Sequence, residues 1–228
     1  MLARLGIAPR TIIDVGANVG QFTVAASKIL RPSRVHCFEP LPDCVSKLRA
    51  NVSSLTDVHV HACAVGEEDG TCRMRVNYYS PSSSLLPLAE QHRSAFPEAE
   101  EVGCVNVEIS TLDRVFGDAP LELPVLLKVD VQGYEAAVLR GAQKLLKCVS
   151  HAVIETSLKP MYETEPLFMD IARFMEQCGF RFAGPVGYLR HPVSGEVLQL
   201  DALFERRDPL KTRDDRRREA FVDEGTML

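Results

Sequence analysis

The 228-residue sequence has no apolar stretch near the length that a membrane-spanning helix requires. Such a helix needs about 20 predominantly apolar residues. The first residues, MLARLGIAPRT, are soon interrupted by Pro9 and Arg10 and do not have the pattern of a secretory signal peptide. We therefore expect a cytoplasmic protein without a membrane span.

Excess positive charge and paired cysteines are also missing. The net charge is −5, whereas a dedicated nucleic-acid-binding protein usually carries a basic patch or stripe, so we expect no nucleic-acid partner. The seven cysteines contain no C-x-x-C pair, and the six histidines show no metal-ligand spacing. This pattern argues against a zinc site and against a disulfide framework. We predict no bound metal and thiols kept in a reducing compartment.

Apolar runs alternate with amphipathic segments along most of the chain. Strands are predicted at residues 11–15, 34–38, 58–62, 124–130 and 151–155. Helices are predicted at 21–30, 43–50 and 133–146, and a further helix is expected to be capped by Thr164 and to end at Gly179. Residues 180–183 and 198–204 predict a closing hairpin. The alternation is typical of an α/β fold in which helices cover both faces of a mostly parallel sheet.

The segment from about residue 67 to 110 interrupts this alternation. It predicts strands near 72–76 and 105–109 with a mobile polar loop between them. Ser110 and Asp113 have the spacing of a capping box for a short helix that starts at Thr111. Long loops inside compact domains are usually functional or disordered. We predict one domain over residues 1–205 that contains this insertion, followed by a charged tail over residues 206–228.

The first predicted strand ends in the motif DVGANVG, which contains Asp14, Gly16 and Gly20. Glycines between a strand and a helix let a ligand approach backbone amides and the helix N-terminus. The spacing differs from the G-x-G-x-x-G motif of dinucleotide-binding proteins, and the carboxylate of Asp14 would repel a pyrophosphate. A carboxylate suits a positively charged ligand, such as the amino and sulfonium groups of S-adenosylmethionine. The alternative is a turn that only connects strand and helix.

Glu39 ends the second predicted strand, 25 residues after Asp14. An acidic side chain at this position can accept hydrogen bonds from both hydroxyls of a ribose. Oxidoreductases with nucleotide cofactors use the same arrangement, so Glu39 alone does not identify the ligand. Together with DVGANVG it favours S-adenosylmethionine.

Several segments resemble the FkbM-type family of S-adenosylmethionine-dependent methyltransferases, namely DVGANVGQFT, CFEP, TLDRV, LLKVDVQGYEAAVLRGA and AVIETS. The resemblance covers roughly residues 11–184, and KVDVQGYEAAVLRGA is its most specific part. It implies a Rossmann-like fold with a seven-stranded sheet. It also implies methyl transfer, usually to a hydroxyl oxygen of a sugar, glycan or natural-product acceptor. The cofactor-binding residues that we assign on this basis are Asp14, Gly16, Ala17, Asn18, Gly20, Glu39, Pro40, Ala64 and Val65.

The sequence departs from the family at Gln132, where the family more often has glutamate. If that glutamate carried charge chemistry, this protein works without it. We therefore assign no acid or base role to position 132.

Asp130 and Glu155 end the fourth and fifth predicted strands, at the edge where ligands of open α/β sheets bind. An alcohol is a weak nucleophile at neutral pH, and a positioned base accelerates its reactions by about 100-fold or more. Asp130 is the first candidate for this base and Glu155 the second, while a helix cap is another role open to Asp130. Lys128 lies in a buried strand and needs a partner, for which Asp130, Glu135 and Glu155 are candidates.

No motif specifies the acceptor. Tyr78, Tyr79 and Ser82–Ser84 suit a sugar pocket or form a polar loop without a ligand. His92 could reach an acceptor from the insertion, but we expect it in solvent. Methyl transfer to nitrogen or carbon stays open, as does a cofactor-binding protein without catalysis. The glycine spacing disfavours an NAD-linked oxidoreductase.

Overall fold

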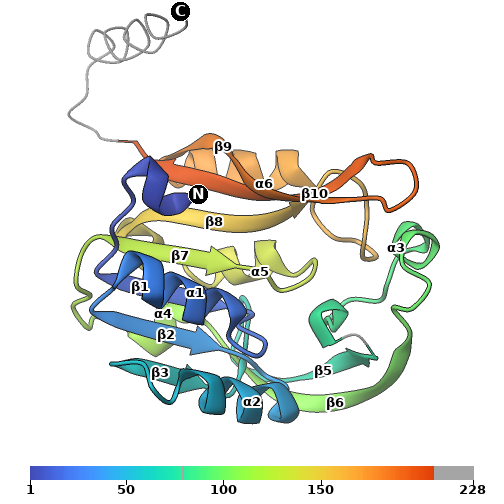
Figure 1. The fold of residues 1–228 in the computed structure, drawn as a ribbon, viewed down its shortest axis with the longest axis horizontal. Coiled ribbons are helices and arrows are strands. Elements are labelled where there is room, and N and C mark those ends of the chain that lie inside the picture. Colours follow the sequence, from blue (N-terminus) through green and yellow to red (C-terminus); the bar gives the residue numbers. More distant parts are fainter. Residues whose placement is uncertain (79, 208–228) are drawn as a thin grey trace, which may run out of the picture.

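The main sheet has the α/β topology expected from the sequence. The computed structural model describes residues 1–78 and 80–207. The strands of this sheet are β1 (Thr11–Val15), β2 (Arg34–Phe38), β3 (Val58–His61), β7 (Val125–Val129), β8 (Val149–Ser157), β9 (Phe180–Arg190) and β10 (Val197–Arg206). Within the described residues they form one seven-stranded sheet in the order β3-β2-β1-β7-β8-β10-β9 (Figure 1). Neighbours pair in parallel except β10, which is antiparallel to β8 and β9. The predicted fold class is confirmed.

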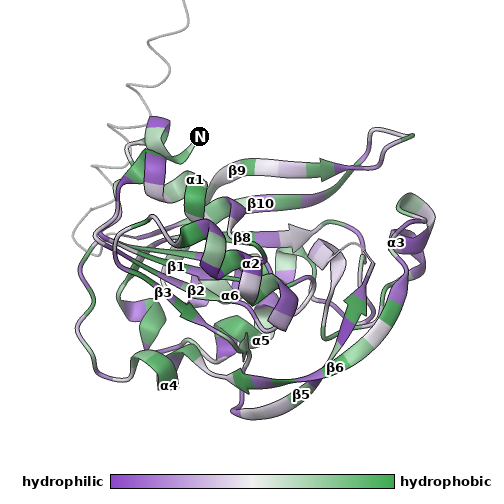
Figure 2. Ribbon diagram, turned by 60° about the horizontal axis from the view of Figure 1, so that its bottom comes forward, coloured by the Kyte–Doolittle hydropathy of each residue, from purple (hydrophilic) through white to green (hydrophobic). Residues whose placement is uncertain are grey.

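Helices cover both faces of this sheet. The described helices are α1 (Gln21–Leu30), α2 (Pro42–Val52), α3 (Glu90–Ala95), α4 (Leu112–Phe116), α5 (Glu135–Arg140) and α6 (Phe168–Gln177), of which α3 belongs to the insertion and does not cover this sheet. The 3-10 turns are η1 (Leu2–Leu5), η2 (Ser80–Ser82) and η3 (Leu145–Lys147). Successive strand residues face opposite sides. Ile12 therefore packs with α1 and α2, and Ile13 packs with α4, α5 and α6. Figure 2 shows α1 and α2 on one side of the central strands and α4 and α5 on the other. None of the described helices is long and apolar enough to cross a membrane.

The insertion builds a second sheet beyond the carboxyl ends of the central strands. This sheet contains β4 (Ala64–Val65), β5 (Gly70–Asn77) and β6 (Glu101–Ser110), in the order β4-β6-β5. Figure 1 shows β5, β6 and α3 on the side to which the arrowheads of β7 and β8 point. Both strands predicted in the insertion are present, and each is longer than expected.

The polar loop expected between these strands is partly wrong. It contains η2 and α3, and its apolar residues pack in a cluster that consists of Leu88, Ala95, Ala99, Met161, Tyr162 and Leu198. His92 was expected in solvent, but it is only 4% exposed, because its ring lies against Phe96 and Tyr162. Tyr79 and the tail from residue 208 lie outside the described residues.

Four helix boundaries differ from the expectation, and one of them is that of α2, which spans Pro42–Val52 instead of residues 43–50. The helix predicted over residues 133–146 is confined to α5, because the chain turns at Gly141, where a side chain would collide with a neighbouring carbonyl group. Thr164 caps no helix: its φ is 62°, and α6 begins four residues later. α4 is capped by Thr111 rather than Ser110, since the Thr111 side chain accepts a hydrogen bond of 3.1 Å from the amide of Arg114.

Candidate active site

A cavity of about 360 Å³ opens at the carboxyl ends of β1, β2, β7 and β8. Ligands of open α/β sheets bind at this edge, and the volume lies in the usual range for ligand pockets. Residues of the insertion, including Ser80, Ser83 and Leu85, line one side. The wall includes the predicted residues Gly16, Ala17, Asn18, Glu39, Pro40, Ala64, Val65, Asp130 and Glu155. The structure does not bring Asp14 or Gly20 to this wall.

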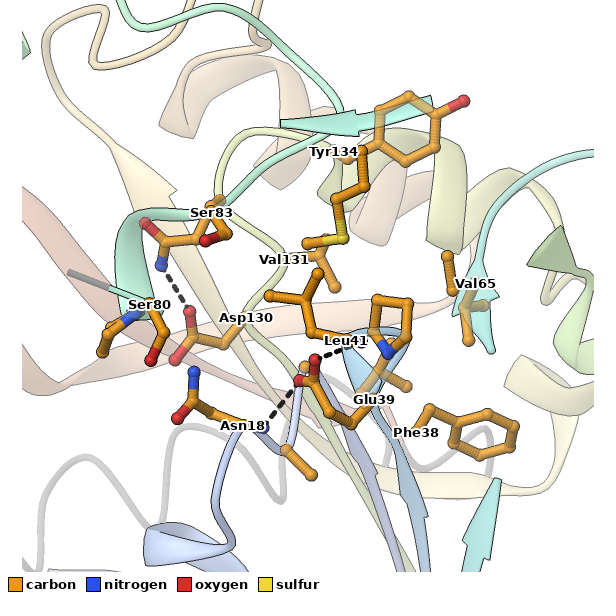
Figure 3. A pocket seen from close by; sticks show the side chains of 18 of the residues that line it. Asn18, Phe38, Glu39, Leu41, Val65, Ser80, Ser83, Asp130, Val131 and Tyr134 are labelled. Carbon is orange, nitrogen blue, oxygen red and sulfur yellow. Dashed lines mark hydrogen bonds between the residues drawn. The ribbon is translucent and has the colours of Figure 1, made fainter. Parts of the chain in front are cut away.

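Glu39 is fixed at the cavity wall by two backbone amides. Its Oε2 accepts a hydrogen bond of 2.9 Å from the amide of Asn18, and its Oε1 accepts one of 2.9 Å from the amide of Leu41 (Figure 3). A carboxylate oxygen has two acceptor sites, so each oxygen keeps one for a ligand. Burial raises the pKa of Glu39 to about 7. The geometry fits two neighbouring hydroxyl donors, as in a ribose.

The amides of the loop between β1 and α1 are largely used within the protein. Gly16 and Ala17 both donate to the carbonyl of Phe38 at 3.0 Å, and Gly20 donates to the carbonyl of Ala17 at 2.8 Å. In the described part of the chain, no acceptor is found for the amides of Gln21 and Phe22, which line the cavity in the first turn of α1. An anionic group of a ligand would therefore find its donors in this turn rather than in the loop.

The two glycines of DVGANVG are needed for packing. A side chain on Gly16 would collide with the backbone carbonyl of Asp130, at the end of the neighbouring strand. At Gly20, a Cβ atom would lie 2.7 Å from Cδ1 of Leu48 in α2. Both residues have positive φ, 82° and 91°, which other residues rarely adopt. The glycine spacing thus follows from the close approach of this loop to β7 and α2.

Asp14 lies fully buried behind the wall. Its Oδ2 accepts a hydrogen bond of 2.6 Å from the hydroxyl of Thr23, and its Oδ1 is 3.7 Å from Nζ of Lys128. At 3.7 Å, Asp14 and Lys128 form an ion pair but no hydrogen bond. Asp14 therefore contacts Thr23 and Lys128 rather than the cavity, and burial raises its pKa.

The expected ion pair of Lys128 forms with Asp130, at 3.0 Å between Nζ and Oδ2. Burial alone would lower the pKa of Lys128, but attraction to Asp130 and Asp14 outweighs it and keeps the ammonium charged. Burial alone would likewise raise the pKa of Asp130, but the charge of Lys128 and the hydrogen bonds to Asp130 lower it. Asp130 is thus an ionised carboxylate at neutral pH.

The pKa of Glu155 is shifted in the opposite direction. Burial raises its pKa well above the ordinary value, and the negative charge of Asp130 raises it further. Two carboxyl groups at one site do not ionise equally, because like charges repel in a poorly solvated environment. The pKa of Asp130 is therefore lowered and that of Glu155 is raised, so Asp130 is the more acidic carboxyl group of the pair.

Gln132 joins the two carboxyl groups. Its Nε2 donates to Oδ1 of Asp130 at 2.7 Å and to Oε2 of Glu155 at 2.8 Å. The sequence identified this position only as a departure from the family and gave no sign of these contacts.

Asp130 does not take the helix-cap role considered for it, since the N-cap of α5 is Tyr134 with no side-chain cap hydrogen bond. Glu135 instead holds the turn that precedes this helix. The Oε1 atom of Glu135 accepts hydrogen bonds from the amides of Val131 at 3.0 Å and Gly133 at 3.2 Å. These amides precede α5, so Glu135 satisfies the turn and leaves Asp130 on the cavity wall.

The cavity has an apolar and a polar end on either side of Glu39. Figure 3 shows Phe38 and Val65 on one side of Glu39 and Asp130 and Ser83 on the other. A flat apolar group and a polar acceptor would each find a matching surface here. The two ends belong to one continuous cavity.

The geometry agrees with the family assignment that the comparisons give. The model of the methyltransferase FkbM domain matches residues 14–182. The chain belongs to this family. The prediction of an S-adenosylmethionine-dependent methyltransferase is therefore confirmed at the level of the family.

Curated relatives include three methyltransferases. "Methyltransferase 1" of Beauveria bassiana is 30% identical over 142 residues, which are 57% of this chain and 57% of that protein. "2-O-methyltransferase NoeI" of Sinorhizobium fredii is 25% identical over 67% of this chain and 65% of that protein. "31-O-demethyl-FK506 methyltransferase FkbM" of Streptomyces tacrolimicus is 29% identical over 58% of this chain and 59% of that protein. The chain thus matches less than two thirds of the length of these three relatives.

Solved structures share the fold at low sequence identity. The N-methyltransferase NodS from Bradyrhizobium japonicum WM9, in complex with S-adenosylhomocysteine, has a TM-score of 0.52 at 10% identity and covers 91% of this chain and 83% of its own. A putative RNA methyltransferase from Pyrococcus horikoshii has a TM-score of 0.50 at 16% identity and covers 92% and 80%. These likenesses show the Rossmann-like methyltransferase fold alone.

Proposed function

We propose that the protein transfers the methyl group of S-adenosylmethionine to a hydroxyl oxygen of a sugar, glycan or natural-product acceptor. One observation carries the proposal: Glu39 and the pair of Asp130 and Glu155 line the same cavity. The carboxylate of Glu39 suits the hydroxyls of a ribose. The pair of Asp130 and Glu155 suits a reacting hydroxyl, whose proton it could accept. The names of two relatives, a 2-O-methyltransferase and a 31-O-demethyl-FK506 methyltransferase, support oxygen as the methyl acceptor.

The wall offers matching groups for the ribose, the adenine and the carboxylate of the cofactor. Both oxygens of Glu39 are available to the ribose hydroxyls. Apolar residues beside it, Phe38, Ala64 and Val65, suit the adenine. The first-turn amides of α1, at Gln21 and Phe22, suit the carboxylate of the cofactor. When bound, the cofactor supplies an electrophilic methyl group on a sulfonium.

Asp130 and Glu155 would orient the acceptor and take its proton. Asp130 is ionised and can accept a hydrogen bond from the hydroxyl, which fixes the oxygen for in-line attack. The same contact gives the hydroxyl proton a destination as the oxygen becomes bonded to carbon. The carboxyl of Glu155 shares Gln132 with Asp130, so the pair acts as one proton-holding unit. Asp130 stays the first candidate because its pKa is lowered and it is ionised at neutral pH, whereas burial raises the pKa of Glu155.

A labelled-methyl assay tests this function. The protein is incubated with methyl-labelled S-adenosylmethionine and fractions of small molecules and glycans, and labelled products are analysed by mass spectrometry and NMR. We expect label in a methoxy group. Label in an N-methyl or C-methyl group, or no transfer by a protein that binds S-adenosylmethionine, would contradict the proposal.

We also propose a cytoplasmic protein with one domain over residues 1–205, the insertion included, and no nucleic-acid partner. All seven cysteines lie in the described residues, and none of them forms a disulfide there. This agrees with a reducing compartment. Leu88, Ala95 and Ala99 of the insertion pack in one cluster with Met161, Tyr162 and Leu198 from the rest of the chain, which supports a single domain. The net charge of −5 supports the absence of a nucleic-acid partner.

A further inference from the structure

The side-chain amide of Gln132 lies between two carboxyl groups and one hydroxyl. Its Nε2 donates to Asp130 and to Glu155, and its Oε1 accepts a hydrogen bond of 2.7 Å from the hydroxyl of Tyr162. A carboxamide has two N–H donors and one carbonyl acceptor. The three contacts therefore agree with the donors and the acceptor of the amide. Both N–H groups donate to carboxyl oxygens, and the carbonyl oxygen accepts from Tyr162.

Tyr162 fixes the orientation of this amide. If the amide were rotated by half a turn, its carbonyl would face the ionised Asp130, and the two oxygens would repel each other. The hydroxyl of Tyr162 favours the observed orientation because it donates to the carbonyl. Its ring is fully buried and lies directly against Gly133, where a Cβ atom would be 3.0 Å from the Cβ of Tyr162. The hydroxyl is therefore held in place.

The backbone of Gln132 is held as firmly as its side chain. Its φ is 59°, in the left-handed region that residues other than glycine seldom adopt. Such a conformation persists only where the surroundings determine it. Here the hydroxyl of Ser84 donates to the carbonyl of Gln132 at 2.6 Å, and Tyr162 also lies 3.2 Å from the carbonyl of Ser82. The insertion thus contacts Gln132 both directly and through Tyr162.

We propose that Gln132 is a positioning residue for methyl transfer: oriented by Tyr162, its amide holds Asp130 and Glu155 together as a single acceptor for the proton of the hydroxyl. This inference rests on the proposed function. The proposal also gives a role to Ser82 and Ser84 of the insertion. Through their contacts with Tyr162 and Gln132, they connect the insertion to the carboxyl pair. Glutamate at position 132 would instead add a third carboxyl group and could not donate to the other two when ionised.

Other charged groups face the pair and stay unchanged in the test. Lys128 in β7 lies 3.0 Å from Asp130 and attracts both carboxylates, and Asp14 in β1 faces Lys128 from the other side. Glu135 of α5 and Asp201 of β10 raise the pKa of Glu155 through their negative charges. Any change of titration in the test must therefore come from Gln132 or Tyr162.

The titration of the carboxyl pair in the ligand-free protein tests the proposal without any acceptor. Side-chain carboxyl carbons are labelled with ¹³C, and the signals of Asp130 and Glu155 are assigned with Asp130→Asn and Glu155→Gln. Gln132→Met keeps the length of the side chain but has no donor. We expect it to raise the titration midpoint of Asp130 by about one pH unit, because hydrogen bonds to the ionised form are lost.

Tyr162→Phe keeps the ring and removes only the hydroxyl. We expect a smaller shift in the same direction, because the amide of Gln132 is then free to turn. Tyr188→Phe in β9 is the matched control, since Tyr188 is 60% exposed and contacts neither group, and it should leave the midpoints unchanged.

If the titration midpoints of Asp130 and Glu155 are unchanged in Tyr162→Phe, the proposal is overturned. This variant decides the question even if Gln132→Met fails to fold. Calorimetric titration with S-adenosylmethionine is run on the same samples, and we expect Tyr162→Phe to bind it as the wild type does, because Tyr162 does not line the cavity. A wild-type protein that does not bind S-adenosylmethionine would contradict the proposed function, whereas the carboxyl titration would still report on Gln132. The two failures are therefore distinguishable.

Discussion

Glu39 is the side chain whose geometry defines the cofactor end of the cavity. Two amides hold its oxygens, so the carboxylate cannot turn away from a ligand. Hydrogen bonds to charged groups contribute about 1.5–3 kcal/mol each. We predict that Glu39→Ala raises the Kd for S-adenosylmethionine by at least about tenfold, as measured by calorimetry. Circular dichroism should show an unchanged fold.

Glu122→Ala is the control for this substitution. Glu122 pairs with Arg10 on the surface, where both side chains are more than half exposed, and lies far from the cavity wall. Wild-type affinity is expected for this variant. Wild-type affinity for Glu39→Ala would mean that the ribose binds elsewhere.

The pKa of Glu39 predicts how cofactor binding depends on pH. Burial raises this pKa to about 7, above the ordinary value of 4.5, so the folded protein binds this proton more tightly than the unfolded chain does. The contribution of Glu39 to stability is therefore present at low pH and is lost as pH rises through about 7. The ribose hydroxyls need the ionised acceptor. Affinity for S-adenosylmethionine should therefore fall as pH decreases below 7, by up to about tenfold per pH unit.

Glu39→Ala separates this effect from titration of the cofactor itself. Calorimetry from pH 5.5 to 8.5 should show a shallower pH dependence for the variant than for the wild type. Equal slopes for the two proteins would show that Glu39 does not titrate in this range, or that it does not bind the cofactor.

Asp130 and Glu155 make separate predictions at the acceptor end. Asp130→Asn keeps the size of the side chain but removes its basicity, so turnover should fall by about 100-fold or more while S-adenosylmethionine affinity changes little. Steady-state assays with the acceptor found by labelled-methyl transfer measure both. If Glu155→Gln loses turnover and Asp130→Asn retains it, the base is Glu155. If both retain it, orientation of the acceptor carries the reaction.

The sequence predicted the residues of the wall better than the contacts among them. Glu39 and Asp130 follow strands directly, and a strand end is visible in a sequence. The contact between Tyr162 and Gln132 spans 30 residues, and nothing in the local pattern of either segment indicates it. Asp14 was expected at the ligand, but the burial of β1 on both faces turns it toward Thr23 and Lys128 instead.

At the scale of elements, strong local patterns were predicted and long-range packing was not. The bounds of β1, α1 and β2 equal those expected, because a β-branched run, a helical apolar stripe and a proline after the helix all point the same way. The helix of the insertion was missed. α3 has six residues, and its stability comes from Met161 and Tyr162, which are distant in sequence.

The apolar cluster that packs against α3 predicts that the insertion can open separately from the main sheet. Leu88 is buried in this cluster together with Met161 and Tyr162, and Leu88→Ala removes part of its apolar packing. Substitutions of this kind cost about 2–5 kcal/mol. Hydrogen exchange should therefore accelerate in residues 80–99 and leave β7 protected, because local opening affects the least stable unit first. Val102→Ala is the control, since Val102 is 60% exposed. Uniform acceleration over the whole chain would show that the insertion does not open separately.

At the scale of the whole molecule, the order of the strands brings the two ends of the site together. β1 lies between β2 and β7, so Glu39 at the end of one neighbour and Asp130 at the end of the other reach the same edge. This follows from the parallel alternation of strands and helices and was predictable. The way in which the insertion lines the cavity could not be predicted from the sequence. The strands β4, β5 and β6 form a separate sheet, and its position depends on long-range packing.

A crystal structure with S-adenosylhomocysteine tests the central claim most directly, since the claim is that one cavity holds the cofactor between Glu39 and the carboxyl pair. We predict ligand density in this cavity, with the ribose hydroxyls bonded to both oxygens of Glu39 and the sulfur directed toward Asp130 and Glu155. Density at another surface, or a ribose without contact to Glu39, would contradict the account.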